Sequence, residues 1–346
     1  ATKVETLLFP FTGTKIVNSS AFPRCNLTDD FNNILLPVTY SVVLVFGLLL
    51  NLTVMYTIVF RIKHWSPNTI YMINLTVCDT FYILTLPFLI YYHASKKNWP
   101  FGEVFCKLIR FLFYTNLYGS ILFLTCISVH RYIVVCHPVR SMGLVNACRA
   151  RYVSVLVWVV VLIFQAPVLY FTQIKKERCS DTTADHLFVH FLPYSSFISV
   201  SFFLIPFLLV IVCNSLMVRK LIQPSRVGGA ISQNSKRKSV KMIVIVMLVF
   251  IVCFVPFHLT RSLHYVFRYL TVSCNHLVGS RIVYKVSRHL ASINSCIDPI
   301  LYFLAGQGFR RSLPKKMKQD QNTMRSLVPL YSFLSWSLIH ENDTFS

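Results

Sequence analysis

The sequence predicts an all-α membrane protein, a single bundle of seven transmembrane helices with a short amphipathic helix after the seventh. Of its 346 residues, 55% are hydrophobic and 13% are charged, whereas an ordinary soluble domain carries about a quarter charged residues. The apolar residues also come in long runs, and none of these runs alternates as a barrel strand would. This composition excludes disordered and collagen-like chains and disfavours a string of soluble domains.

Seven stretches are long and apolar enough to span a membrane, since about 20 residues cross about 30 Å of hydrocarbon. They cover residues 35–61, 69–94, 104–136, 152–172, 194–218, 241–268 and 280–304. Prolines within five of them remove backbone hydrogen bonds and permit kinks, which act as hinges or as static bends. These prolines are Pro87, Pro167, Pro206, Pro256 and Pro299.

The stretches divide the chain into three parts. Residues 1–34 form an extracellular tail, residues 35–304 the membrane domain, and residues 305–346 a cytoplasmic helix and tail. This orientation places 19 of the 34 Lys and Arg on the cytoplasmic side, as short cytoplasmic loops require. Asn18 and Asn26 begin glycosylation sequons in the outer tail. Residues 306–313 are predicted to lie as a basic amphipathic helix on the membrane lipid of the inner leaflet.

The outer half carries more positive charge than insertion requires. It holds 15 Lys and Arg but only seven of the 12 acidic residues. Several of the cations follow one another at helical steps of three and four, which places them on one face. The sixth stretch holds His258, Arg261, Tyr265 and Arg268, the seventh holds Arg281, Lys285 and Arg288, and the third holds Arg110.

Two interpretations of these cations compete. Ionisable groups at membrane depth usually face the bundle interior and serve a function, and Arg and Lys together suit phosphate. Alternatively, long stems let the charges reach the headgroups, which accounts well for Arg268 and Arg281 at the outer ends. That account is weaker for Arg261 and Arg288, about two turns further in, so we favour an anion-binding site. Phe113, Tyr114, Tyr118 and Tyr265 would line it, either stacking on a base or serving as plain core.

Four cysteines lie in the oxidising outer space. They are Cys25, Cys106, Cys179 and Cys274, and four cysteines allow three disulfide pairings, among which spacing does not choose. A zinc site is the other interpretation, but no CxxC or HxxxH spacing supports it. We expect disulfides and no structural metal here.

Polar residues also lie deep in the predicted helices. Asn51, Asp79, Ser120, Asn294 and Asp298 all fall in the middle of apolar stretches. They could simply hydrogen-bond between helices, but two carboxylates at bilayer depth are costly and indicate an ion- or proton-coupled switch.

Catalysis and transport receive little support. No GxSxG, HExxH, Walker or GxGxxG motif occurs, so the protein is not expected to be an enzyme, to use a cofactor or to bind nucleic acid. A transporter would show an internal repeat, and seven helices do not halve. A retinal protein would need a buried lysine where this chain has Ser292.

A combination of motifs over residues 25–313 resembles the rhodopsin-type G-protein-coupled receptors. The motifs are Gly47 with Asn51, Leu75-Thr-Val-Cys-Asp79, Cys106, His130-Arg131-Tyr132, Trp158, Pro206, Phe250-x-x-Cys-Phe-x-Pro256 and Asp298-Pro-Ile-Leu-Tyr302. The resemblance implies that His130, Arg131, Tyr132, Asp298, Pro299 and Tyr302 form the G-protein switch. It also implies a sodium-linked polar core of Asp79, Ser120, Asn294 and Asp298. His130 departs from the family's usual acid before Arg131, which weakens the expected ionic lock.

Within that superfamily the chain is similar to the metabotropic nucleotide receptors, and closest to the members that respond to UTP and ATP. The stretches that carry this resemblance are Phe111-Leu-Phe-Tyr-Thr-Asn-Leu-Tyr118, Pro256-Phe-His258-x-x-Arg261, Tyr284-Lys-Val-Ser-Arg288 and Gln165-Ala-Pro-Val-Leu-Tyr-Phe171. It implies Cys106–Cys179 and Cys25–Cys274 disulfides, a phosphate site of Arg110, His258, Arg261, Lys285 and Arg288, and a pocket lined by Tyr114, Tyr118 and Tyr265. Asp185 is expected to pair with an arginine of the empty pocket.

The expected function is that of a plasma-membrane receptor for extracellular UTP or ATP. It would couple to a heterotrimeric G protein of the Gq/11 class, which activates phospholipase C and releases calcium. The alternative is a receptor for another small anion, a dicarboxylate or a leukotriene-like lipid acid. Two arginines suit a dicarboxylate, whereas the fuller cationic set favours a longer anion.

Overall fold

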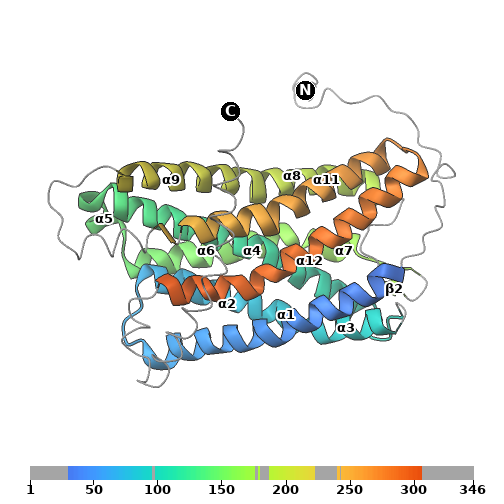
Figure 1. Cartoon of the computed structure of the whole chain (residues 1–346), viewed down its shortest axis with the longest axis horizontal. Coiled ribbons are helices and arrows are strands. Elements are labelled where there is room, and N and C mark those ends of the chain that lie inside the picture. The colour runs from blue at the N-terminus through green and yellow to red at the C-terminus, as the bar shows by residue number, and fades with distance from the viewer. Residues whose placement is uncertain are drawn as a thin grey trace, which may run out of the picture.

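Long helical rods run side by side along the long axis of the molecule (Figure 1). The computed structural model describes residues 30–95, 98–175, 178–179, 187–222, 240–241 and 243–305. Six of the rods are long and apolar enough to cross a membrane: Leu35–Arg61, Pro67–Ala94, Gly102–Cys136, Ala147–Phe171, Phe188–Ile222 and Ile243–Tyr269. The predicted tails and the amphipathic helix at 306–313 lie outside the described residues.

The seventh rod is α12, Cys274–Ala305, with 32 residues. At 1.5 Å per residue it is about 48 Å long, enough to span. It carries Arg281, Lys285, Arg288 and Asp298, and so it is less apolar than the other six. Neighbouring helices pack against the side of α12 that carries these charges, so the helix can span the membrane without being apolar throughout.

Most rods are interrupted near a proline. The second rod breaks after Ile83, and Pro87 lies in the first turn of the next helix. The fourth resumes at Pro167. In the fifth and sixth, π-helical turns come just before Pro206 and Pro256. Pro299 lies inside α12 without ending it.

The helices have the following bounds. The first and second rods comprise α1 (Asp30–Tyr56), η1 (Thr57–Arg61), α2 (Pro67–Ile83) and α3 (Leu86–Ala94), and the third is α4 (Gly102–Cys136). After α5 (Pro138–Leu144), the fourth rod comprises α6 (Ala147–Gln165) and α7 (Pro167–Phe171), and the fifth α8 (Phe188–Ser199), η3 (Val200–Leu204) and α9 (Ile205–Ile222). The sixth contains η4 (Phe250–Phe254) and α11 (Val255–Tyr269).

Two details differ from the sequence prediction. The fifth and seventh helices begin at Phe188 and Cys274, six residues before the predicted starts, because helical hydrogen bonding continues beyond the apolar part that hydropathy detects. A small antiparallel hairpin also interrupts the all-α architecture: β1 (Ile174–Lys175) pairs with β2 (Arg178–Cys179).

Helix α4 lies at the centre of the packing and contacts α2, α6 and α9, while α1 and α11 both contact α12. Its approach to α2 is close at Gly119, where an added Cβ would lie 2.8 Å from the Cys78 sulfur. An alanine at position 119 would therefore force the Cys78 side chain to shift.

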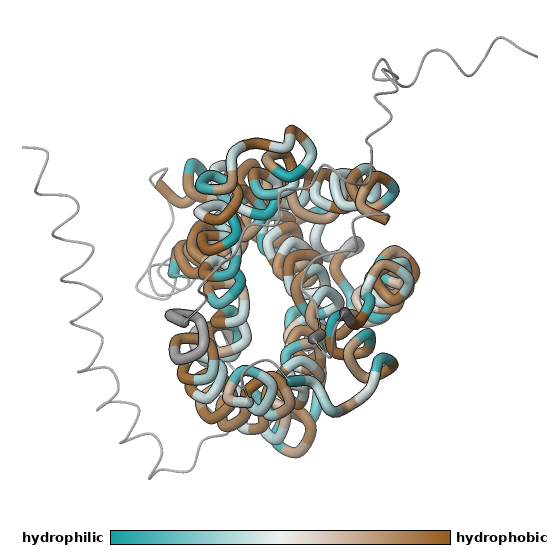
Figure 2. The backbone as a smooth tube through the Cα atoms, turned by 90° about the vertical axis from the view of Figure 1, so that its right-hand side faces the viewer, coloured by the Kyte–Doolittle hydropathy of each residue, from teal (hydrophilic) through white to brown (hydrophobic). Residues whose placement is uncertain are grey.

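The surface of the bundle is apolar, as lipid requires. Seen from the end of the bundle in Figure 2, hydrophobic residues colour every helix rather than only the inward sides. Phe46, Leu49 and Phe60 are 58%, 61% and 72% exposed. Such a surface would aggregate in water and is typical of a multi-pass membrane protein.

Candidate ligand-binding site

Three side chains one turn apart on α4 begin the site. Arg110, Tyr114 and Tyr118 follow each other at intervals of four, and all three are buried. Tyr114 and Tyr118 lie parallel, with ring centroids 6.3 Å apart. Since residues four apart share a helix face, this face points into the bundle from the turn after Cys106 inward.

Arg261 of α11 reaches across to this face. Its Nη1 donates to the Tyr118 hydroxyl at 2.7 Å and its Nη2 to the Ser195 hydroxyl of α8 at 2.8 Å. The Cζ atom lies 5.2 Å from the ring centroid of Tyr114 and 5.6 Å from that of Tyr265. Arg261 is only 3% exposed, so hydroxyls and aromatic faces stabilise a guanidinium held away from solvent.

Arg288 of α12 has similar surroundings. Its Nη2 donates to the Tyr284 hydroxyl at 3.0 Å, and its Cζ lies 5.2 Å from the ring centroid of Phe113 on α4. Tyr114 interacts electrostatically with both Arg261 and Arg288. From different helices, Arg261 and Arg288 thus each pack over a neighbouring aromatic side chain of α4, Tyr114 and Phe113 respectively.

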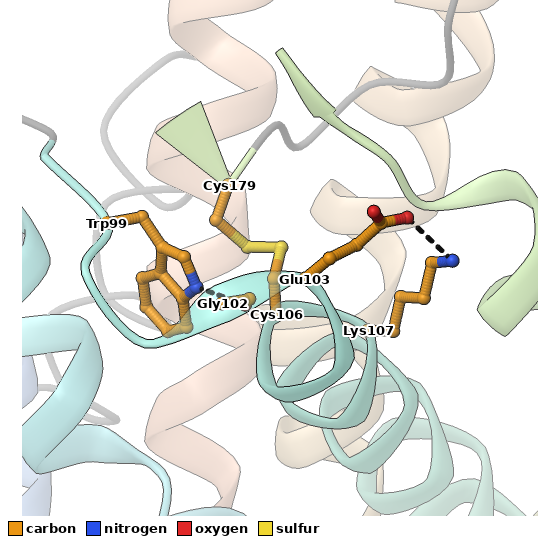
Figure 3. A network of polar contacts seen from close by, with 6 residues as sticks. All are labelled: Trp99, Gly102, Glu103, Cys106, Lys107 and Cys179. Atoms are coloured by element: carbon orange, nitrogen blue, oxygen red, sulfur yellow. Dashed lines mark hydrogen bonds and ion pairs between the residues drawn. A yellow bond between two sulfur atoms is a disulfide. The ribbon is translucent and has the colours of Figure 1, made fainter. Parts of the chain in front are cut away.

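Arg110 connects the site to the hairpin. Its Nη2 donates to the Cys179 carbonyl at 3.2 Å, and Cys179 is joined to Cys106 by a disulfide. Figure 3 shows this disulfide beside the Trp99 indole, which donates to the Gly102 carbonyl at 2.8 Å. The expected Cys106–Cys179 pair is thus present. Cys274 is disulfide-bonded as well, and its expected partner, Cys25, lies outside the described residues.

The remaining predicted residues differ in position. Lys285 is half-buried on α12, and Tyr265 packs against Phe191 with ring centroids 5.5 Å apart. His258 stacks on Phe203 of η3, with centroids 4.0 Å apart and planes 5° apart. Its ring is therefore held by an aromatic neighbour. Asp185 lies outside the described residues.

Carboxylates are scarce around this site. Among the described side chains, the acids are Asp79, Glu103 and Asp298, and Glu103 pairs with Lys107 at 2.7 Å (Figure 3). Asp298 is ten residues beyond Arg288, about 15 Å along the helix. The described part of the site thus combines three buried arginines with neutral hydrogen-bond acceptors, an arrangement suited to an anionic ligand.

Hydroxyl pairs fasten α11 to α12 beside the site. Thr260 and Ser287 hydroxyls lie 2.6 Å apart, and His264 Nδ1 lies 3.0 Å from the Ser280 hydroxyl. The His264 ring also stacks on Tyr284 at 5.9 Å. The parts of α11 and α12 that lie beside the site therefore pack as one unit, the α11–α12 unit.

The residues of the predicted polar core lie deeper in the bundle. Asn51 Nδ2 donates to the Ser295 carbonyl at 2.8 Å, Asn116 Nδ2 to the Ser295 hydroxyl at 3.0 Å, and Ser120 to Asn116 at 3.2 Å. Asn294 lies 3.4 Å from an Asp298 oxygen. Both Asp79 oxygens and Asp298 Oδ1 are buried with no hydrogen-bond partner within 3.5 Å among the described residues.

These oxygens suit a hard cation in donor type. Within the described ranges, however, no group of three or more His, Cys, Asp or Glu is arranged to hold a metal ion. Carboxylate, amide and hydroxyl oxygens together would have to hold the expected sodium, which stays a prediction.

At the opposite end, the predicted switch residues are described in part. His130 packs edge-on against Tyr71, with centroids 6.3 Å apart, and Arg131 is half-buried. Tyr132 packs against His137. Pro299 lies inside α12, whereas the side chain of Tyr302 is outside the described part. No described acid pairs with Arg131, and the weakened lock expected from His130 stays a prediction.

Sequence reasoning did not identify four members of these networks. Ser195 and Tyr284 hydrogen-bond to the arginines, and Asn116 and Ser295 connect the polar core. Tyr284 stands four residues before Arg288, so helical spacing could have revealed it. No sequence signal distinguishes Ser195 from its neighbour Ser196.

Comparisons with known proteins agree with this architecture. The family described as 7 transmembrane receptor (rhodopsin family) matches residues 50–302. Purinoceptor 2 of Rattus norvegicus is 50% identical over 82% of this chain and 77% of its own length. Purinoceptor 4 of Rattus norvegicus is 41% identical over 100% and 98%, and purinoceptor 1 of Cavia porcellus 41% identical over 89% and 84%.

Both the family match and the coverage of these relatives extend over most of the chain, and the resemblance found from the motifs is confirmed. The protein is a G-protein-coupled receptor of the membrane rather than an enzyme. The chain belongs to the rhodopsin family of seven-transmembrane receptors and, within it, to the G-protein-coupled purinoceptors.

Proposed function

We propose that this receptor binds an extracellular nucleoside triphosphate, UTP or ATP, and activates a heterotrimeric G protein of the Gq/11 class. The purinoceptor names of its relatives support a nucleotide ligand. The proposal places the N-terminal tail, with the acceptors Asn18 and Asn26, on the outside of the plasma membrane, and residues 305–346 in the cytoplasm.

One observation carries the proposal: three helices each bury an arginine in the interior of the bundle. Arg110 comes from α4, Arg261 from α11 and Arg288 from α12. A guanidinium group binds phosphate through two parallel N–H···O hydrogen bonds. In our proposal the three arginines hold the phosphate chain together with Lys285 and His258, and Tyr114, Tyr118 and Tyr265 line the pocket. Asp185 pairs with a cation of the empty site.

Binding would favour the active receptor by drawing helices together. Phosphate between Arg110 and the α11–α12 unit brings that unit towards α4. Because η4 and Pro256 weaken the sixth helix just below Arg261, the same movement swings its far end away from Arg131. The ligand must bind the active state more tightly than the inactive state for this shift to occur.

The test is calcium release in cells that lack endogenous nucleotide receptors. Cells expressing this chain are challenged with UTP, ATP, UDP, ADP, succinate and 2-oxoglutarate, with surface expression measured in parallel. A response to UTP or ATP at about micromolar concentration supports the proposal and ranks the two bases. Selective inhibition of the Gq/11 class should abolish that response.

Other outcomes would refute parts of the proposal. A response to a dicarboxylate without a response to any nucleotide would retain an anion site and reject the nucleotide. A nucleotide response through another G-protein class would reject only the Gq/11 assignment. Silence towards every ligand, with the receptor present at the surface, would reject the ligand class in this assay.

A further inference from the structure

Arg261 has more hydrogen-bond donors than its partners in the structure use. A guanidinium carries five N–H groups, and Arg261 gives one to Tyr118 and one to Ser195. Its Nε is buried and has no hydrogen-bond partner among the described residues. Arg261 therefore keeps donor capacity for a ligand, and binding does not require either existing hydrogen bond to break.

Ser195 lies on the inward face of α8. Phe188, Phe191, Ser195 and Ile198 follow at steps of three, four and three, and all four are buried. The helix is fixed from its other side, because the neighbouring Tyr194 hydroxyl donates to the Phe164 carbonyl of α6 at 2.8 Å. Ser195 thus presents its oxygen to Arg261 from a helix that is itself anchored.

The surroundings of this hydrogen bond are apolar. Phe188, Phe191 and Tyr265 form a buried cluster between α8 and α11, with Phe191 and Tyr265 centroids 5.5 Å apart. Such packing limits the access of water, which would otherwise compete for the guanidinium. Ser195 and Tyr118, both neutral, therefore determine the plane in which Arg261 lies.

We propose that Ser195 is a positioning residue of the ligand site, which orients the Arg261 guanidinium so that its remaining donors face an anionic ligand. The inference rests on the proposed function, because the ligand that Arg261 meets is a nucleotide phosphate. Ser195 itself does not contact the ligand. Two hydroxyls fix a planar group better than one, so loss of Ser195 leaves Arg261 free to turn about its bond to Tyr118.

The test compares two adjacent serines. Ser195→Ala removes the hydroxyl that holds Arg261. Ser196→Ala removes an exposed hydroxyl whose hydrogen bond, at 2.9 Å, goes to the Leu192 carbonyl of its own helix. Both changes are also made in an Arg261→Ala background. The measurement is the half-maximal UTP and ATP concentration for calcium release, normalised to surface expression.

We expect Ser195→Ala to raise the half-maximal concentration by about three- to tenfold. This is less than the loss of a direct hydrogen bond to a charged group, because Ser195 acts on the ligand only through Arg261. Ser196→Ala should leave it unchanged. In the Arg261→Ala background, Ser195→Ala should add nothing, since the group that it positions is absent. A purely structural role would instead lower the response by a similar factor in both backgrounds.

Three results would overturn the inference while leaving the proposed function intact. The first is equal behaviour of Ser195→Ala and Ser196→Ala. The second is an additional loss from Ser195→Ala when Arg261 is absent. The third is a raised signal without ligand, or a lowered half-maximal concentration, which would make Ser195 a restraint on Arg261. Silence of the wild-type receptor towards both nucleotides would overturn the proposed function, and this inference with it.

Discussion

Replacing Arg261 by alanine should weaken the nucleotide response strongly while sparing the fold. The side chain is 3% exposed and donates at 2.7 and 2.8 Å to Tyr118 and Ser195. Both partners are neutral hydroxyls, so the substitution leaves no buried charge without a partner, which is the costly case. Ser195 can also donate to a carbonyl of its own helix, as Ser196 does. We therefore expect surface expression close to that of the wild type.

Arg261→Ala should reduce ligand affinity more than it reduces the stability of the fold. A single hydrogen bond from a charged donor contributes about 1.5–3 kcal/mol, and about 1.4 kcal/mol corresponds to a tenfold change in affinity. Even one lost phosphate contact should therefore raise the half-maximal UTP or ATP concentration at least tenfold. The assay is calcium release against nucleotide concentration, normalised to receptor at the surface.

Arg268 provides the matched control, because it lies seven residues, about 10 Å, further along α11. Its guanidinium packs 4.1 Å from the Phe188 ring centroid and its side chain is buried, at the outer end of the helix. Arg268→Ala should change the half-maximal concentration by less than about threefold, a loss of about 0.6 kcal/mol or less. A change of less than threefold for Arg261→Ala and for Arg288→Ala would refute the anion site and leave both arginines a structural role in helix packing.

Three further predictions follow from other parts of the molecule. Gly119→Ala should destabilise the purified receptor by about 1–3 kcal/mol, measured by thermal unfolding, because the new Cβ would lie 2.8 Å from the Cys78 sulfur. Adding Cys78→Ala should restore the stability, and a double variant without rescue would contradict the clash. Cys179→Ala removes the disulfide to Cys106, which joins residues 73 apart in sequence, and should destabilise the fold by about 4 kcal/mol. The amount of receptor at the surface should fall sharply. Full expression with an unchanged response would refute a stabilising role of this disulfide. If sodium binds beside Asp79, exchanging it for a large organic cation should shift nucleotide potency by about fivefold, and Asp79→Asn should abolish that dependence; equal salt sensitivity in both receptors would reject the sodium site.

The helices were predictable because hydrocarbon imposes a simple length rule. Each apolar stretch of the sequence corresponds to a rod, including the seventh with its buried charges. The starts at Phe188 and Cys274 were not predictable, because hydropathy detects the apolar part of a helix rather than its last hydrogen bond. The break after Ile83 arises because the Pro87 ring is incompatible with the turn before it. The sequence predicts a kink here but does not predict its geometry.

The cationic face of the site was predictable for the same reason that helix faces are: residues three and four apart point the same way. That argument places Arg261 and Tyr265 together without any knowledge of other helices. It says nothing about which side chain a guanidinium meets across the bundle. Neither Ser195 nor the residues next to it in sequence form a recognisable motif. Only the packing of α8 against α11 makes Ser195 a partner of Arg261.

The scarcity of described carboxylates around the arginines also affects how fast a ligand arrives. A recess of one sign with low-dielectric walls concentrates its field and raises the encounter rate of an oppositely charged molecule by about 10- to 1000-fold. Such steering acts over roughly a Debye length, about 8 Å at physiological salt. The association rate constant of a multiply charged anion should thus fall steeply as ionic strength rises, while its dissociation, governed by the buried hydrogen bonds, changes far less.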